Sequence, residues 1–110
     1  MIHMLSRFNL KPGVSLERFR DDYMALVAHM KDLNLVEGTG KVGQREQATP
    51  MDTDRDDAPE FYAVMMFKDR DQLDRSYAYL TNKDADMATT HPAVNGAVQD
   101  AVFTCWHDVD

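Results

Sequence analysis

Two segments of the chain, residues 2–10 and 60–67, carry apolar side chains at both odd and even positions. Successive side chains of a β-strand point to opposite faces of the sheet, so these segments predict strands that need cover on both faces. Helices of the same chain can cover one of these faces. The other face needs a different cover, and this requirement constrains the fold more than any other feature of the sequence.

Two helices are predicted by their caps and by apolar residues at helical spacing. Ser15 stands at an N-cap position, and the apolar residues that follow it are Leu16, Phe19, Tyr23, Leu26, Val27, Met30 and Leu33. Asp69 and Gln72 form a capping pair before a second helix, whose apolar residues are Leu73, Tyr77 and Leu80. Residues 91–98 predict a short helical turn, and residues 101–109 predict a last strand.

The remaining segments complete the order of elements. The glycine-interrupted segment 35–48 predicts a bent or bulged strand near a sheet edge, and residues 49–59 predict a solvated acidic loop. The order is then β-α-β-β-α-β in a single domain over residues 1–110. This order predicts an α+β, ferredoxin-like fold with a four-stranded antiparallel sheet and the helices on one face, because both crossovers are right-handed.

The second face of this sheet would be a large apolar patch if it stayed uncovered. Leu5, Val64 and Met66 lie opposite the side chains that pack against the helices. A second copy of the sheet is the simplest cover for such a patch. The sequence therefore predicts a homodimer in which two sheets face each other and form an α/β barrel around a shared cavity.

Charge and composition exclude several classes of partner. The chain has 19 acidic residues against 12 Lys and Arg, which gives a net charge of −7. This balance argues against binding to nucleic acid and to anionic membranes. No apolar run is long enough for a transmembrane helix, and residues 1–7 do not resemble a signal peptide. A single cysteine, Cys105, fits a reducing compartment, so we expect a cytoplasmic protein.

The layout also resembles a known superfamily. The first strand followed by residues 11–15, a helix with Phe19, Tyr23 and His29, and a later run at residues 91–93 are similar to the dimeric α/β-barrel superfamily, in particular to its stress-responsive A/B-barrel and EthD-like groups. That superfamily includes cofactor-free monooxygenases, haem-degrading enzymes, small-molecule isomerases and members without known activity. The resemblance therefore implies the fold and the dimer, and it leaves the activity open.

Strand alternation selects the candidate site residues. His3, Arg7 and Asn9 share one face of the first strand, and the first and last strands are neighbours in this fold. One interpretation is therefore that His3 and His107 meet near Cys105 in the cavity, and the alternative is that both are ordinary surface or edge histidines. The candidate catalytic residues are His3, Arg7 and His107, with His29 in reserve. The candidate ligand-binding residues are Asn9, Tyr62, Met66 and Phe103. The alternative for Arg7 is an ion pair with an acid of the partner chain.

The histidines do not lead to the prediction of a metal or another cofactor. His3 and His107 would supply only two ligands to a metal, and no spacing supports a third, so no metal is predicted. His29 lies at the margin of the apolar stripe, where histidines usually pack. His91 before a proline is typical of local turn structure, although a haem-ligand role is an alternative.

Two motifs in the sequence are misleading. Residues 38–43 spell G-x-G-x-x-G, but no strand precedes them and no helix follows to receive a pyrophosphate, so they indicate a bulged strand. Asp52, Asp54 and Asp56 resemble the start of a calcium loop. That loop needs a glycine where Asp57 stands and a glutamate where Ala63 stands, so a solvated loop is the better interpretation.

Two functions from different classes fit these observations. The first is a dimeric protein that binds a small apolar molecule in the barrel cavity, with cofactor-independent monooxygenation or isomerisation as candidate reactions. An apolar pocket with a few convergent polar groups is the usual small-molecule site. The alternative is a non-catalytic stress-responsive or structural dimer with a filled core. The sequence does not decide whether the protein is an enzyme, and it identifies no substrate.

Overall fold

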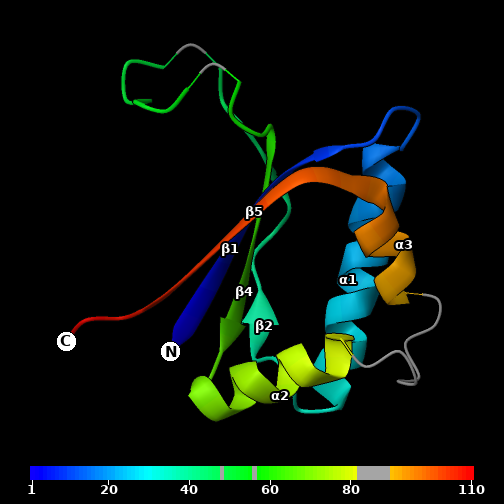
Figure 1. Cartoon of the computed structure of the whole chain (residues 1–110), viewed down its shortest axis with the longest axis vertical. Helices are drawn as coiled ribbons and strands as arrows, with labels where there is room; N and C mark the ends of the chain where they lie inside the picture. The colour runs from blue at the N-terminus through cyan, green and yellow to red at the C-terminus, as the bar shows by residue number, and fades with distance from the viewer. Residues whose placement is uncertain (48, 56, 82–89) are drawn as a thin grey trace.

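The computed structural model describes residues 1–47, 49–55, 57–81 and 90–110, with the side chains of residues 90–92 excepted. Figure 1 shows the arrangement of the elements. In chain order they are β1 (Ile2–Leu10), α1 (Leu16–Asp32), β2 (Gly38–Thr39), β3 (Gly43–Gln44), β4 (Phe61–Phe67), α2 (Arg70–Thr81), α3 (Thr90–Ala97) and β5 (Val98–His107).

The sheet has the ferredoxin-like strand order. Its path is β2-β4-β1-β5, β3 also pairs with β4, and every pairing is antiparallel. The predicted strand over 35–48 is present as two short pieces, β2 and β3, on the same side of β4. Between these pieces the Gly40 amide still donates to the Val64 carbonyl at 3.0 Å. The prediction of an irregular edge strand is therefore confirmed, and so is the predicted fold class.

The core lies between one face of the sheet and the helices. Along β4 buried and half-buried residues alternate, and the buried ones are Phe61, Ala63, Met65 and Phe67. They form one cluster with Phe8 and with the buried residues of α1, which are Phe19, Tyr23, Leu26, Val27 and Met30. The Ser15 hydroxyl accepts the Arg18 amide at 3.2 Å, as the predicted N-cap requires. Leu16 and Leu33, at the two ends of the stripe, are exposed.

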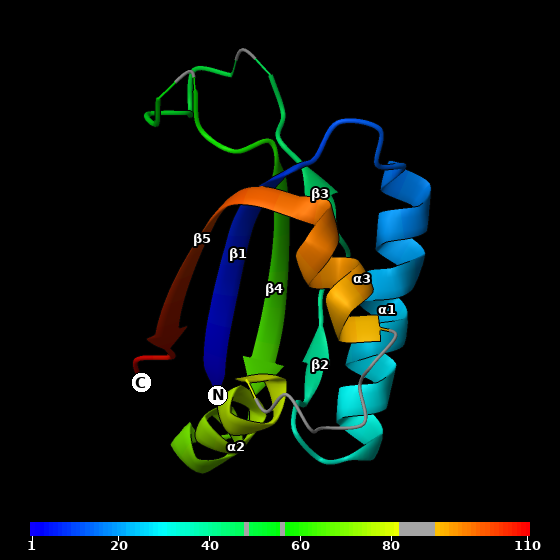
Figure 2. The ribbon, with the colours of Figure 1, turned by 45° about the vertical axis from the view of Figure 1, so that its right-hand side comes forward.

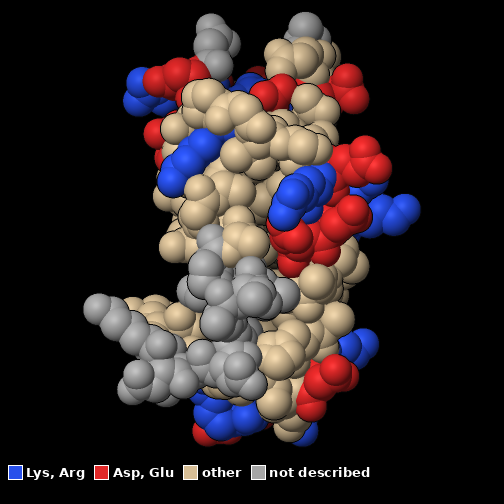
Figure 3. All heavy atoms as spheres, turned by 90° about the vertical axis from the view of Figure 1, so that its right-hand side faces the viewer, with Lys and Arg blue, Asp and Glu red and all other residues tan. Residues whose placement is uncertain are grey.

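Helix α2 lies across one end of the sheet, whereas α1 and α3 lie together beside it (Figure 2). Asp69 caps α2, because its carboxylate accepts the Gln72 amide at 2.9 Å. The buried residues of α2 are Gln72 and Ser76. The predicted stripe is wrong for Tyr77, which is 69% exposed, because α2 turns a more polar side toward the fold. On the side of the molecule where α1 and α3 lie, acidic and basic side chains stand close together on the surface (Figure 3).

The opposite face of the sheet consists of three rows of side chains that face away from the buried core, and we call it the open face. It is made of His3, Leu5 and Arg7 of β1, Tyr62, Val64 and Met66 of β4, and Val102, Thr104 and Trp106 of β5. The β4 members are only half-buried and the β5 members are exposed. This surface is the uncovered apolar face that the sequence predicts.

A β-bulge in β5 decides which residues reach the open face. Arg7 pairs with Val102 but Asn9 pairs with Gln99, so β5 holds one extra residue in this stretch. Asp100 adopts a positive φ of 57° at the bulge, and the Asn9 amide donates to its carboxylate at 3.1 Å. After the bulge the register is regular up to His107.

The predicted meeting of His3 and His107 is wrong. His3 lies opposite Trp106, whereas His107 lies opposite Ile2 and therefore on the helix side of the sheet. Phe103 lies opposite Ser6 and is also on the helix side. The physical reason is that alternation fixes the faces within one strand only. The register between strands, here set by the bulge, decides which residue of β5 meets His3.

Candidate functional site

His3 forms the most organised polar group on the open face. Its Nε2 lies 2.8 Å from a carboxylate oxygen of Asp108, and its ring stacks on Trp106 with a centroid distance of 5.0 Å and an interplanar angle of 19°. An ionised carboxylate only accepts hydrogen bonds, so Nε2 carries the proton and Nδ1 keeps a free lone pair. The arrangement therefore fixes both the orientation and the tautomer of an imidazole that can accept a proton.

Arg7 lies further along the same row of β1. Its Nε is buried, and it has no hydrogen-bond partner among the residues that the structure describes. Its nearest neighbours in the sheet are Tyr62 on β4 and Val102 on β5. Arg7 follows His3 by four positions along the strand, which places their Cα atoms about 13 Å apart. Leu5 lies between them, so the two polar groups flank an apolar middle.

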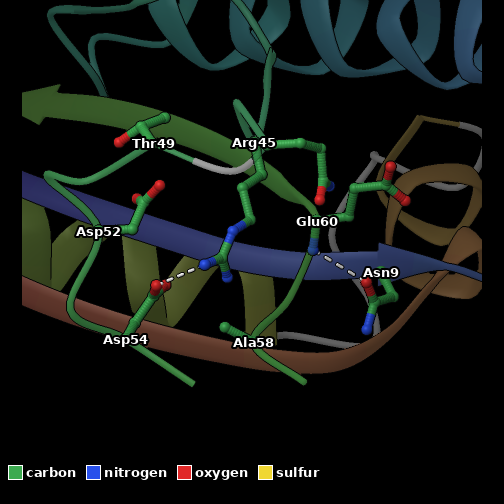
Figure 4. Close-up of a pocket in the computed structure, with 8 residues that line it drawn as sticks. Asn9, Arg45, Thr49, Asp52, Asp54, Ala58 and Glu60 are labelled. Carbon is green, nitrogen blue, oxygen red and sulfur yellow. Dashed lines mark hydrogen bonds and ion pairs between the residues drawn. The ribbon is translucent and has the colours of Figure 1, made fainter. Parts of the chain in front are cut away.

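A polar pocket of about 570 Å³ lies where the loop after β3 meets the end of β1. Its lining is Asn9, Arg45, Gln47, Thr49, Asp52, Asp54, Ala58 and Glu60. Figure 4 shows the Arg45 guanidinium directed at Asp54 and the Asn9 side chain accepting the Glu60 amide, at 3.0 Å. The Glu60 carboxylate in turn accepts from the Gln44 side chain at 2.9 Å. These groups satisfy one another, and Asn9 also holds the bulge, so Asn9 has a structural task in this pocket.

His107 and Cys105 lie in a different place, a cleft of about 380 Å³ on the helix side. Ile2, Arg70, Leu73 and Trp106 complete its lining. The thiol of Cys105 is exposed. Two basic residues, His107 and Arg70, line the same cleft. The structure does not bring Cys105 or His107 together with His3 or Arg7.

His29 also lies away from the open face. It is half-buried between α1 and α2, where its Nε2 is 3.4 Å from the Tyr79 hydroxyl. This contact is typical of the packing role that a histidine at a stripe margin takes. The side chain of His91 lies outside the described residues, so neither of its two interpretations is tested.

The described residues offer no cluster for a metal ion. No group of three or more His, Cys, Asp or Glu side chains in this part of the chain could hold one. In the acidic loop, Asp54 pairs with Arg45 and Asp57 pairs with Arg55. The glycines of residues 38–43 lie in β2, β3 and the link between them, as the bulged-strand interpretation predicts. None of the described helices is long and apolar enough to cross a membrane.

Sequence reasoning missed two residues of the site, Asp108 and Trp106. Trp106 is 43% exposed and stacks on His3. Asp108 follows the last paired residue of β5, and the antiparallel pairing of β1 with β5 brings it beside the start of β1. An acid directly after the last strand was the available signal. It could be used only once the register was known.

The fold recurs in solved structures of low sequence identity. The structure of At3g17210 from Arabidopsis thaliana resembles this chain with a TM-score of 0.69 and 11% identity, over 100% of this chain and 97% of that one. An antibiotic biosynthesis monooxygenase gives 0.62 and 17%, over all of both chains. A dimeric ferredoxin-like protein of unknown function from Bacteroides fragilis gives 0.57 and 10%, over 97% and 95%. These identities show a shared fold alone.

Comparison by sequence gives a family without an assigned activity. A search of the curated proteins returns no significant match. The model of a family of unknown function, DUF6614, matches residues 1–110, which is the whole of the sequence. A match of this extent establishes membership, and the chain therefore belongs to the DUF6614 family.

Proposed function

We propose that the protein is a homodimer that binds a small, largely apolar molecule between two open faces and removes a proton from it with His3. The observation that carries the proposal is the His3–Asp108 pair, held against Trp106 on a face that also presents Leu5, Val64 and Met66. A base oriented by a carboxylate is the usual arrangement for proton abstraction.

The dimer follows from the exposure of the open face. Leu5, Val64 and Met66 are only partly covered in the single chain, and Val102 and Trp106 on the neighbouring strand are 44% and 43% exposed. Two such sheets packed face to face lie about 10 Å apart, and their side chains fill this space or enclose a cavity. The Bacteroides fragilis protein of the same fold is itself described as dimeric, which supports this arrangement.

Proton removal is the step that the two candidate reactions share. In an isomerisation, the proton taken from one carbon by Nδ1 of His3 is returned at another carbon. In a cofactor-independent monooxygenation, the carbanion or phenolate left behind donates electrons to dioxygen, which is the co-reactant. The similarity in fold to an antibiotic biosynthesis monooxygenase supports the second reaction only as a class.

Because the substrate is unidentified, the proposal is tested with a general probe of bases in apolar sites, 5-nitrobenzisoxazole. A base removes its C–H proton, the N–O bond breaks, and a coloured cyanonitrophenolate forms. We expect the protein to accelerate this elimination and H3Q to lower the rate by about 100-fold, the lower end of what a general base supplies. We expect D108N to lower kcat by about tenfold with little change in KM, because Asp108 stabilises the imidazolium that forms.

The matched control is H107Q, which changes the same residue type on the other side of the sheet. We expect this variant to keep the rate of the unmodified protein. Equal rates for H3Q and H107Q would show that His3 is not the base. No acceleration by the protein, together with no binding of the neutral apolar probe N-phenyl-1-naphthylamine, would instead support the non-catalytic dimer with a filled core.

A further inference from the structure

We infer that the molecule bound on the open face is an anion and that Arg7 binds its negatively charged oxygen. This inference rests on the proposed function and adds the chemical class of the ligand. The observation behind it is the state of the Arg7 side chain, which is half-buried on an apolar surface with its Nε buried and without a partner in the described part of the chain.

Arg7 differs in this respect from three arginines that are more exposed. Arg18, Arg55 and Arg70 have side chains that are 84%, 84% and 79% exposed, and each of them pairs with an acid. Arg7 forms no ion pair within the described ranges, although the chain contains 19 acidic residues. A buried polar group without a partner is costly, and more so when it is charged. The surroundings of Arg7 therefore favour an anionic partner from outside the chain.

Three acids of the chain already have partners of their own. Asp108 accepts from His3, Glu60 accepts from Gln44, and Asp54 pairs with Arg45. A second copy of the chain would bring the same acids with the same partners. A carboxylate, phenolate or similar oxygen of the ligand is the partner that we infer for the buried Nε of Arg7. A guanidinium suits this role because it offers several donors in a planar fork and keeps its charge.

The positions of His3 and Arg7 also define the shape of the ligand. About 13 Å separates their Cα atoms along β1, and Leu5 and Val64 form the apolar floor between them. A molecule that contacts both groups is elongated, presents an acidic proton at one end and carries its negative oxygen at the other. The class is an apolar carboxylate or phenolate.

Two fluorescent probes that share one apolar body test this inference. 1-Anilinonaphthalene-8-sulfonate carries an anionic group, and N-phenyl-1-naphthylamine is the same body without it. We expect the sulfonate to bind the unmodified protein at least about tenfold more tightly, as for a hydrogen bond to a charged group. Electrostatic attraction between the anionic probe and the protein as a whole cannot cause this preference, because the chain has a net charge of −7. We expect R7M to abolish the preference without changing the affinity for the neutral probe.

The controls separate the possible failures. R18M removes an arginine that is 84% exposed on α1 and should leave both affinities unchanged. R7K keeps the charge and should keep part of the preference for the sulfonate. This variant tests the inference if R7M does not fold. If neither probe binds the unmodified protein, the proposed function itself fails. If both bind equally, or if R7M separates the dimer in sedimentation velocity without altering the preference, Arg7 has another partner and this inference alone is overturned.

Discussion

Tyr23 shows how one buried polar group ties α1 to the sheet edge. Its side chain is 4% exposed, and its hydroxyl lies 2.8 Å from that of Thr39 in β2. The Thr39 hydroxyl gives its single hydrogen to a carbonyl, of Gly40 or Val64, so Tyr23 is the donor in this contact. Burial raises the pKa of Tyr23 above its usual value of 10.0, and the bond to Thr39 offsets part of this rise.

This raised pKa predicts a loss of stability at alkaline pH. The folded chain holds the Tyr23 proton more tightly than the unfolded chain, so the contribution is complete below pH 10.0 and is lost as the pH rises from there through the folded pKa. We expect Y23F to lower the free energy of unfolding by about 1 kcal/mol at neutral pH. The difference from the unmodified protein should shrink above pH 10.0 in urea denaturation. Y77F, at an exposed tyrosine, is the control, and a pH-independent difference for Y23F would contradict the assignment.

At the scale of elements, α2 is held to the fold by a polar contact. Gln72 is 1% exposed, its side-chain oxygen accepts the Lys68 amide at 2.7 Å, and its amide donates at 3.3 Å to the Asn34 carbonyl and to the Glu37 carboxylate. The residue thus links α2 to the end of α1 and to the segment that leads into β2. A buried side chain with this many partners fixes the position of a helix that lies at the end of the sheet.

We therefore expect Q72L to destabilise the protein by about 1 kcal/mol, because it removes the hydrogen bonds that the buried Gln72 side chain makes with Lys68, Asn34 and Glu37. The change is apolar and close in size, so lost packing contributes little. The measurement is the urea midpoint, and the matched control is Q47L, which makes the same substitution at an exposed glutamine. Similar midpoints for the two variants would show that Gln72 does not anchor α2.

The elements also show where sequence reasoning reaches its limit. The α1 stripe and the two central strands follow directly from hydrophobic period and capping, and they are where the sequence predicts them. The buried side of α2 was missed because Gln72 and Ser76 are polar and break that period. The register of β5 was missed because a bulge at Asp100 leaves no hydrophobic signature. Two predicted cavity residues, His107 and Phe103, therefore lie on the other side of the sheet, and Asp108 and Trp106 stand beside His3.

The whole molecule is flat, and one face of its sheet is left open. Its principal extents are 42 × 41 × 18 Å, so it is a flat plate in which the sheet and helices α1 and α3 lie side by side (Figure 1). The radius of gyration is 14.5 Å, against about 13 Å for a compact domain of this length. A plate of this kind exposes a large surface for its volume. A second plate on the open face would bury the part of that surface that is most apolar.

The corresponding test is a charge placed on the open face. V64D introduces a carboxylate at the centre of this face, and in a face-to-face dimer two such groups would have to be buried without partners. We expect V64D to sediment as a monomer and the unmodified protein as a dimer. M24D, which adds the same charge at a 45% exposed position of α1, should remain dimeric. A monomeric unmodified protein would contradict the dimer and, with it, the enclosed cavity.

The side chains of β5 form two sets that point to opposite faces of the sheet, and the bulge decides which set lies on the open face. One set is Val102, Thr104 and Trp106, and the other is Phe103, Cys105 and His107. Deleting a single residue between Gln99 and Val102 would bring the second set next to His3, with no substitution in the strand itself. β4 pairs with β1 without any irregularity and can change its lining only one residue at a time. In β5, a change in length by one residue would therefore replace the whole set of side chains on the open face.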